Sequence, residues 1–514
     1  MERRTFLKQC TLMAGTITIP GIFGCRSLAK SNGTTPNIKT PNIVYILTDD
    51  MGYGDVSCLN ENSKIKTPYM DKLAEDGMIF TDAHSSSAVC TPTRYGILTG
   101  RYNWRSRLKR SVLGGYSEHL IDPERLTVAD LMKQHKYHTA CIGKWHLGWD
   151  WAKNGPKQTD VDFTEPVKNG PDVNGFDYYY AHCGSLDMAP YVYVENGKAT
   201  AQPDRNTESK DKYGWWRKGP TGADFDHADV LPNFTRRGAS YIKERAKTGK
   251  PFFLYLALPA PHTPILPTQE FQGKSGINPY CDFVMMVDHC IGQITKAIDE
   301  SGIKEDTLII VTADNGCSPA AKFDEMLAKN HNPSYVYRGH KADIFEGGHR
   351  IPFIARWPAQ VKARSQCDDT VCLTDLMATC ADIVAAKLPD NAGEDSVSIL
   401  PDLMGTATKP LREATVHHSI NGSFSIRQGK WKLELCPGSG GWSEPRPGKK
   451  TESMPAVQLY DLSRDIAEKN NVQDKHPDIV KRLTDLLQTY VDQGRSTPGN
   501  PQKNEGDTPI MRKG

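Results

Sequence analysis

Two short apolar segments, each followed by a pair of oxygen-bearing side chains, place the strongest constraint on how this chain can fold. Asn42–Thr48 is partly β-branched and runs into two aspartates, and Thr307–Thr312 is soon followed by an Asp-Asn pair. Such runs are typical of buried strands in a parallel sheet. Because ligands bind outside the carboxyl ends of such strands, we expect one site there. Its expected members are Asp49, Asp50, Asp314 and Asn315.

Helices and strands alternate along most of the chain. Thr67 is a suitable N-cap for a helix that starts at Pro68 and ends before Gly77. Other patterns predict helices over 126–135 and 279–301, and strands over 137–142 and 251–258. This order predicts an α/β fold with a large mixed, mostly parallel sheet sandwiched by helices. The weakly periodic residues 150–235 predict a long insertion of the kind that builds binding surface.

The pattern changes near residue 391. Residues 424–435 predict a hairpin around Gln-Gly, Leu459–Leu462 a short strand, and 476–492 an amphipathic helix. We therefore expect a smaller C-terminal antiparallel sheet closed by a helix. The expected parts of the chain are an export signal and linker (1–35), a catalytic domain (36–390), a C-terminal subdomain (391–495) and a loose polar tail (496–514).

The first residues predict an exported protein. Glu2–Lys8 contains adjacent arginines and resembles a twin-arginine signal, and the apolar run that follows is too short to span a bilayer. Ile22–Cys25 resembles a lipoprotein cleavage box, which would place a lipid on Cys25; cleavage elsewhere is the alternative. We expect the export machinery as a partner, and a location in the periplasm or on a lipid anchor at the cell surface.

Charge and cysteine content exclude some classes of function. The formal net charge is only +2, so nothing global favours binding to nucleic acid or to a membrane surface. The 13 cysteines include no Cys-x-x-Cys pair and no zinc-like spacing with histidine. An oxidising compartment permits disulfides, but their connectivity stays open.

The four oxygen-bearing side chains at the strand ends favour a hard cation. Carboxylate and amide oxygens without clustered His or Cys suit Ca²⁺ or Mg²⁺ better than zinc. An Asp pair after a strand can also cap a helix or lie in a solvated turn. The second oxygen-rich turn, which has its own glycine at Gly316, favours the metal site.

A thiol, a proline and an arginine lie within five residues at Cys90–Arg94, in the pattern Cys-x-Pro-x-Arg. Taken alone, this pattern fits a reactive or structural cysteine in a turn equally well. Further candidates follow in Gly-Lys-Trp-His, in a proline-flanked turn after a predicted strand, and in a Gly-rich segment near residue 340. They are Lys144, His146, His262 and Lys341. If extended, Lys144 and His146 would share one face of the chain.

Together these residues resemble the type I sulfatases, a formylglycine-dependent, arylsulfatase-like family of the alkaline phosphatase superfamily. The order of Asp49-Asp50, Cys90-x-Pro-x-Arg94, Gly-Lys144-Trp-His146, His262, Asp314-Asn315 and Lys341 is the order of that family. The resemblance spans most of the chain. It implies a large α/β domain with a smaller C-terminal antiparallel sheet, and hydrolysis of sulfate esters.

The resemblance also implies a role for each residue. Cys90 would be oxidised to formylglycine (3-oxoalanine), whose hydrate attacks sulfur and is later regenerated by elimination. The two strand-end pairs would hold Ca²⁺, which polarises the sulfate. Arg94 would stabilise the hydrate, and Lys144 and Lys341 the sulfate charge. His146 would assist elimination, and His262 would protonate the leaving oxygen. A formylglycine-generating or a radical maturase would be a partner.

The substrate is expected to be a sulfated carbohydrate. Residues 175–191 mix aromatics with polar groups, and Trp215 lies in a second aromatic segment. His182, Asp187 and Trp215 are therefore candidate sugar contacts, although the first segment also fits a packed irregular loop. Within the family the chain is most similar to bacterial carbohydrate 6-O-sulfatases that act on galactose or N-acetylgalactosamine, which predicts an exo-acting enzyme of that kind.

Two other functions remain open. A formylglycine-type phosphonate or phosphate ester hydrolase of the same superfamily would use a related site. A glycan-binding surface lipoprotein with an inactive site is the second alternative, although the complete set of residues argues against it.

Overall fold

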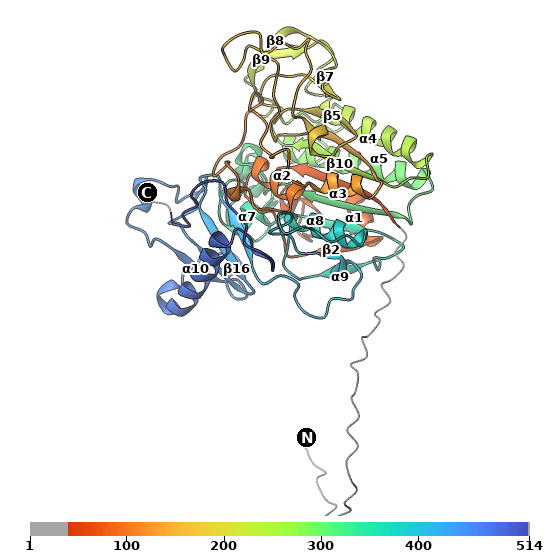
Figure 1. The fold of residues 1–514 in the computed structure, drawn as a ribbon. Helices are drawn as coiled ribbons and strands as arrows, with labels where there is room; N and C mark the ends of the chain where they lie inside the picture. The colour runs from red at the N-terminus through yellow and green to blue at the C-terminus, as the bar shows by residue number, and fades with distance from the viewer. Residues whose placement is uncertain (1–39, 512–514) are drawn as a thin grey trace, which may run out of the picture. The chain divides into compact units, whose positions relative to one another are not determined.

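The computed structural model describes residues 40–511, so the predicted export signal and the lipidation of Cys25 lie outside the described residues. A ten-stranded sheet forms the centre of this part of the chain (Figure 1). In sheet order the strands are β13 (Ser365–Cys367), β2 (Met78–Phe80), β12 (Phe353–Arg356), β11 (Thr307–Ala313), β1 (Asn42–Asp49), β10 (Phe252–Pro261), β4 (His138–Lys144), β5 (Tyr178–His182), β6 (Val194–Glu195) and β7 (Lys198–Ala199). The neighbours β11, β1, β10, β4 and β5 are parallel, whereas β12 and β6 run antiparallel to their neighbours.

Side chains of a strand alternate between the two faces of its sheet, yet every residue of β10 is buried. Both faces of the sheet are therefore covered, and helices cover them. One group of helices packs together and contacts β10: α1 (Pro68–Glu75), α4 (Val230–Ala246) and α5 (Pro279–Glu300). A second group packs together and contacts β4: α2 (Cys90–Thr99), α3 (Val128–Gln134) and α8 (Leu376–Ile383). Short helices follow at α6 (Phe323–Leu327), α7 (Glu346–His349) and α9 (Leu400–Leu403). The predicted mixed α/β architecture is confirmed.

Local sequence explains where the predicted helices begin. The Asn278 side chain accepts a hydrogen bond from the backbone N–H of Cys281, and Pro279 occupies the first position of α5. Thr127 caps α3 in the same way through Asp130. The predicted element ends are right to within about three residues.

The segment 150–235 contains more regular structure than its weak periodicity predicts. It supplies β5, β6 and β7 to the large sheet, and a separate two-stranded sheet. The latter consists of β8 (Pro203–Ser209) and β9 (Trp216–Gly222). β5 escapes a sequence pattern because it is a short aromatic strand without polar alternation, Tyr-Tyr-Tyr-Ala-His, paired with β4.

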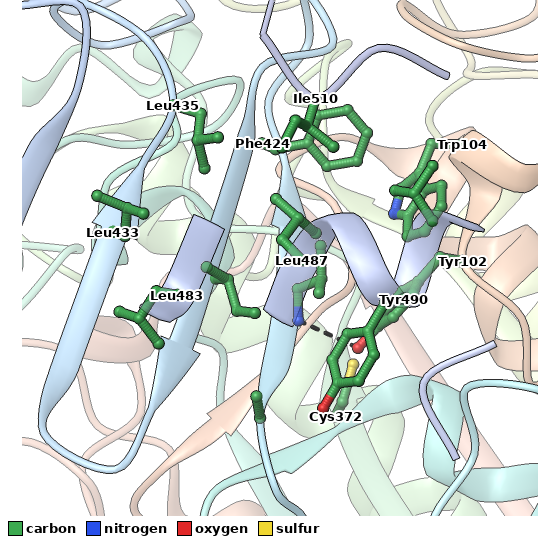
Figure 2. Close-up of a cluster of buried hydrophobic side chains, with 14 of the residues drawn as sticks. Tyr102, Trp104, Cys372, Phe424, Leu433, Leu435, Leu483, Leu487, Tyr490 and Ile510 are labelled. Atoms are coloured by element: carbon green, nitrogen blue, oxygen red, sulfur yellow. Dashed lines mark hydrogen bonds between the residues drawn. The ribbon is translucent and has the colours of Figure 1, made fainter. Parts of the chain in front are cut away.

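The C-terminal part forms a separate antiparallel sheet, as predicted. Its strands and the helix that follows are β15 (Thr415–His418), β16 (Phe424–Gln428), β17 (Trp431–Glu434), β18 (Gln458–Asp461) and α10 (Pro477–Asp492). Gly429 turns the hairpin with a φ of 56°. Figure 2 shows that Leu433, Leu483 and Leu487 of this part gather in one cluster with Tyr102 and Trp104, which follow α2. The helix that carries Cys90 is thus continuous with a core shared with the C-terminal sheet.

The chain after α10 is held in place, in contrast to the loose tail expected from its polar composition. The carbonyl of Lys503 accepts a hydrogen bond of 2.6 Å from Arg101, and the Glu505 N–H donates one of 2.7 Å to the Arg105 carbonyl. Ile510 is buried in the cluster of Figure 2. Polar composition did not reveal these long-range contacts, because backbone groups make most of them.

Residues 40–511 contain neither a disulfide nor a helix that could span a membrane. All 11 cysteines between residues 40 and 511 are free thiols, so no disulfide staples this part of the chain. Within the same residues no helix combines the length and apolarity needed to cross a bilayer.

Candidate active site

The two oxygen-rich strand ends meet because β1 and β11 are parallel neighbours. Thr48 is paired with Ala313, so the residues that follow leave the sheet side by side. The Asp50 backbone N–H donates to Asp314 Oδ1 over 3.2 Å, and Asn315 Nδ2 donates to Asp50 Oδ1 over 2.7 Å. Asp50 adopts a left-handed φ of 64°, which redirects the chain as it leaves the strand. The structure therefore brings together the four side chains that the sequence placed in one site.

Two oxygens of this group have no protein partner. Asp49 Oδ1 and Asn315 Oδ1 are buried and accept no hydrogen bond from any described residue. A buried acceptor without a partner is costly, and a bound cation would remove that cost. Three carboxylates and one amide oxygen form the donor set of a hard divalent ion. The residues present therefore fit Ca²⁺.

Three cations lie against the carboxylates, and Arg94 reaches two of them, Asp314 and, at 3.7 Å, Asp49. Lys144 Nζ lies 2.6 Å from Asp49 Oδ2, Arg94 Nη2 lies 2.7 Å from Asp314 Oδ2, and Lys341 Nζ lies 2.8 Å from Asp50 Oδ2. Burial favours the neutral form of Asp49, but Lys144 and His262 outweigh it and lower the pKa of Asp49 well below its usual value.

Asp314 is shifted in the other direction. Burial and the neighbouring charge of Asp49 raise the pKa of Asp314 to about 6, against the opposing effect of Arg94. The protein cations therefore do not fully compensate the crowded carboxylates, which is what a site prepared for a further positive charge requires.

Cys90 is the first residue of α2 and is 2% exposed. Burial raises the pKa of its thiol, and the charges of Lys144 and Lys341 oppose that rise only in part. Every residue of α2 is buried. An unmodified Cys90 is therefore a neutral thiol at neutral pH, which is a weak nucleophile.

His146 lies beside this cluster as a neutral ring. The chain leaves β4 after Lys144, and His146 adopts a φ of 53°, so the two residues do not share a strand face as an extended chain would place them. Nε2 of His146 donates to the Leu113 carbonyl over 2.7 Å, and its Nδ1 has no partner. Burial and the Lys144 charge lower the pKa of His146 well below its usual value. Its Nδ1 is thus a free proton acceptor.

A cavity of about 540 Å³ opens above Cys90. Cys90, His262 and Lys341 line it, together with Asp187 and Trp215, two of the three predicted sugar contacts. His262 Nδ1 donates to the Thr263 carbonyl over 2.6 Å, which leaves Nε2 3.6 Å from Asp50 Oδ2. The cavity therefore joins the reactive residues to a wall of mixed aromatic and polar character.

His182, the third predicted sugar contact, does not line this cavity. It is the last residue of β5, is fully buried, and stacks against Tyr191. Its Nδ1 hydrogen-bonds locally to Gly184. The sequence left open whether this segment is a sugar-binding wall or a packed irregular loop, and in the structure Tyr178–His182 is a buried strand of the central sheet.

Two more residues line the cavity: Arg217, which belongs to the same predicted segment as Trp215, and Trp442, which the sequence did not single out. Arg217 forms an ion pair with Asp187 Oδ2, and its guanidinium lies 5.4 Å from the ring centre of Trp215. Asp187 Oδ1 is buried and accepts no hydrogen bond. This side of the cavity thus holds a carboxylate oriented by an arginine, with one oxygen free for a ligand.

A sequence model of the sulfatase family matches residues 41–385, which carry every candidate catalytic and metal-ligating residue. The chain belongs to the sulfatase family. This sulfatase is 34% identical to N-acetylgalactosamine-6-O-sulfatase of Bacteroides thetaiotaomicron, over 92% of its own chain and 97% of that protein. It is 29% identical to arylsulfatase A of Homo sapiens, over 92% of each chain.

A solved structure from work on glycosaminoglycan metabolism by Bacteroides thetaiotaomicron superposes with a TM-score of 0.76 at 32% identity. The match covers 88% of this sulfatase and 99% of that chain. The chain is therefore an enzyme that hydrolyses sulfuric ester bonds.

Proposed function

We propose that this sulfatase is an exo-acting carbohydrate sulfatase that removes 6-O-sulfate from galactose or N-acetylgalactosamine. One observation carries the proposal: the cavity lined by Cys90 is also lined by the ammonium group of Lys341 and the imidazole of His262, and by Asp187 and Trp215. A positive charge and a proton donor suit a sulfate ester, and a carboxylate with an aromatic ring suits a sugar. The activity named for the Bacteroides relative supports the choice of sugar.

Ca²⁺ is the metal that we propose for the strand-end site. Asp49, Asp50, Asp314 and Asn315 would hold it, and the unpartnered oxygens of Asp49 and Asn315 support this assignment. When bound, the ion would polarise sulfate oxygens. Lys144 and Lys341 remain beside the carboxylates and would offset the negative charge of the sulfate group.

We also propose that a maturase converts Cys90 to formylglycine. The Cys-x-Pro-x-Arg pattern and the neutral, buried state of the thiol support this. The modification supplies an aldehyde whose hydrate is a nucleophile that can be regenerated. Arg94 would hold Asp314 in position through its two hydrogen bonds of 3.1 and 2.7 Å.

Two histidines are suited to the proton transfers. His146 presents a free Nδ1 that can accept a proton from a hydroxyl group, because its Nε2 is committed to Leu113. His262 has its Nδ1 committed to Thr263, so Nε2 is the atom that can protonate the departing sugar oxygen. His262 lines the cavity, which gives it access to that oxygen.

The location that we propose is outside the cytoplasm. The twin-arginine-like segment Glu2–Lys8 supports export, with the protein either free in the periplasm or lipid-anchored through Cys25. An enzyme in that location would meet sulfated glycans before their uptake.

The function is tested with mono- and disaccharides sulfated at defined hydroxyls. We expect sulfate release from galactose or N-acetylgalactosamine 6-sulfates at a higher kcat/KM than from the 3- or 4-sulfated isomers. Matched sulfate and phosphonate esters are compared in the same assay. Faster turnover of the phosphonate would favour a phosphonate hydrolase, and no sulfate release by a fully modified sample would favour the glycan-binding alternative.

Replacing Asp187 with alanine should impair turnover of the preferred glycan more than that of a small aryl sulfate. Asp187 Oδ1 is free to accept a hydrogen bond from a sugar hydroxyl, and only the glycan offers one. A hydrogen bond to a charged group contributes about 1.5–3 kcal/mol, so we expect kcat/KM for the glycan to fall about 10- to 100-fold. Equal losses on both substrates would remove Asp187 from the residues that recognise the sugar.

A further inference from the structure

The active-site cavity has one wall that comes from the C-terminal part of the chain. Trp442 lines the cavity and is one of the few large apolar side chains that stay exposed, at 36%. Within the described residues its ring stacks on no other aromatic group, and its indole N–H donates to no protein acceptor. An exposed indole without a partner at the rim of a cavity is a surface available to a ligand.

A buried carboxylate fixes the backbone that carries Trp442. Asp343 Oδ1 accepts hydrogen bonds from the N–H groups of Trp442 and Ser443, at 2.7 and 3.0 Å. Asp343 is fully buried. Hydrogen bonds from two consecutive amides to one carboxylate are stronger than bonds to a neutral acceptor, so they fix the backbone of this loop.

The second oxygen of the same carboxylate holds the loop of Lys341. Asp343 Oδ2 accepts from the backbone N–H of His340 over 3.0 Å. The N–H of Ala342 in turn donates 2.8 Å to the carbonyl of Ala88, two residues before Cys90. Asp343 therefore connects the wall that carries Trp442 to the reactive end of the cavity.

The two loops are in direct contact. A Cβ atom on Gly441 would lie 2.4 Å from the Ala342 carbonyl oxygen and 2.5 Å from Asp343 Oδ1, so no side chain fits there. Gly440, with a φ of 59°, turns the chain just before this contact. The glycines let the backbone approach closely, which sets the height of the Trp442 ring above the cavity.

We propose that Trp442 is a carbohydrate-contacting residue of this sulfatase and that Asp343 positions it. The indole offers a flat, negatively polarised face to the C–H bonds of a sugar ring. Trp442 thus recognises the glycan and not the sulfate group. The proposal rests on the carbohydrate sulfatase activity proposed above.

Trp442→Ala and Trp442→Phe test the contact on the sulfated sugar that the wild type prefers. Because the indole acts in binding, we expect Trp442→Ala to raise KM about tenfold with little change in kcat. Trp442→Phe keeps an aromatic ring, so we expect its KM to stay close to that of the wild type. Inorganic sulfate, used as a competitive inhibitor, should keep the same inhibition constant in all three proteins. Tyr69→Ala is the matched control, because Tyr69 is an exposed aromatic outside the cavity.

Binding without turnover gives a second readout. In a Cys90→Ala background, calorimetric titration with the sulfated sugar should show a weaker Kd when Trp442 is also replaced, by the same factor as the change in KM. An unchanged KM and Kd in Trp442→Ala, with an active wild type, would overturn the proposal. A wild type without carbohydrate sulfatase activity would instead refute the function on which it rests.

Asp343→Asn tests the positioning role, because an amide keeps the shape but only one acceptor oxygen. We expect its KM to rise, and the double variant with Trp442→Ala to have a KM below the product of the two single effects, since part of the effect of Asp343 acts through the Trp442 ring. Independent, multiplicative effects on KM would show that Asp343 does not act through Trp442. Thermal melting checks that each variant folds.

Discussion

Replacing Cys90 with alanine should abolish sulfate release while leaving the fold intact. The side chain lines the cavity and lies close enough to Lys144 and Lys341 to feel their charges, where a sulfate ester would be attacked. Without the nucleophile the covalent intermediate cannot form, so the whole reaction route is lost. We therefore expect kcat to fall by about 10⁴-fold or more. Release of sulfate from a defined sulfated sugar is the measurement.

Mass spectrometry distinguishes this mechanism from simple thiol chemistry. The peptide that contains Cys90 should be lighter than its thiol form in active protein, and it should react with a hydrazide reagent for carbonyls. A peptide carrying only the thiol, recovered from fully active protein, would contradict the proposed modification. Cys141→Ala is a suitable control for the loss of activity in Cys90→Ala, and it should retain sulfate release. Cys141 is another buried thiol, on β4, but it does not line the cavity.

Removing the metal should have the second largest effect. Chelation should lower activity about 100-fold or more, and added Ca²⁺ should restore it, because the crowded carboxylates then regain their counter-ion. Binding to the folded state also stabilises it, by about 2.7 kcal/mol at a hundredfold excess of Ca²⁺ over Kd. The melting temperature should therefore rise when Ca²⁺ is added to chelated protein.

Asn315→Ala is the sharpest variant for this site. It removes one ligand oxygen without changing the net charge, and it leaves the ion pairs of Asp49 and Asp314 in place. We expect the Ca²⁺-dependent rise in melting temperature to shrink and activity to require more Ca²⁺. A wild type whose melting temperature ignores Ca²⁺, or an Asn315→Ala protein that responds as the wild type does, would refute the assignment.

The centre of the site was predictable because it depends on topology. Once Asn42–Thr48 and Thr307–Thr312 are recognised as parallel strands, the side chains after them must leave the sheet at the same edge. Cys90 and Arg94 share one turn of a helix, so their relation is also local.

The outer wall of the site was less predictable because it depends on contacts between distant loops. The strand that carries His182 was not recognised, because three tyrosines gave no alternation that would reveal β5. Trp442 lies in a glycine-rich loop, and its place at the cavity depends on contacts with a loop that is distant in sequence, including the hydrogen bond from its N–H to Asp343, 99 residues away. An exposed tryptophan beside Gly440 and Gly441 was the one available signal.

The contacts of Arg101 and Arg105 have a consequence for how the protein is made. These residues follow the helix of Cys90 closely, yet their partners include Lys503, 402 residues further along the chain, and Glu505. The ribosome must therefore finish almost the whole polypeptide before that helix can settle into its final packing. If Cys90 is modified as proposed, the maturase would therefore have to act before this packing is complete, while the thiol is still accessible.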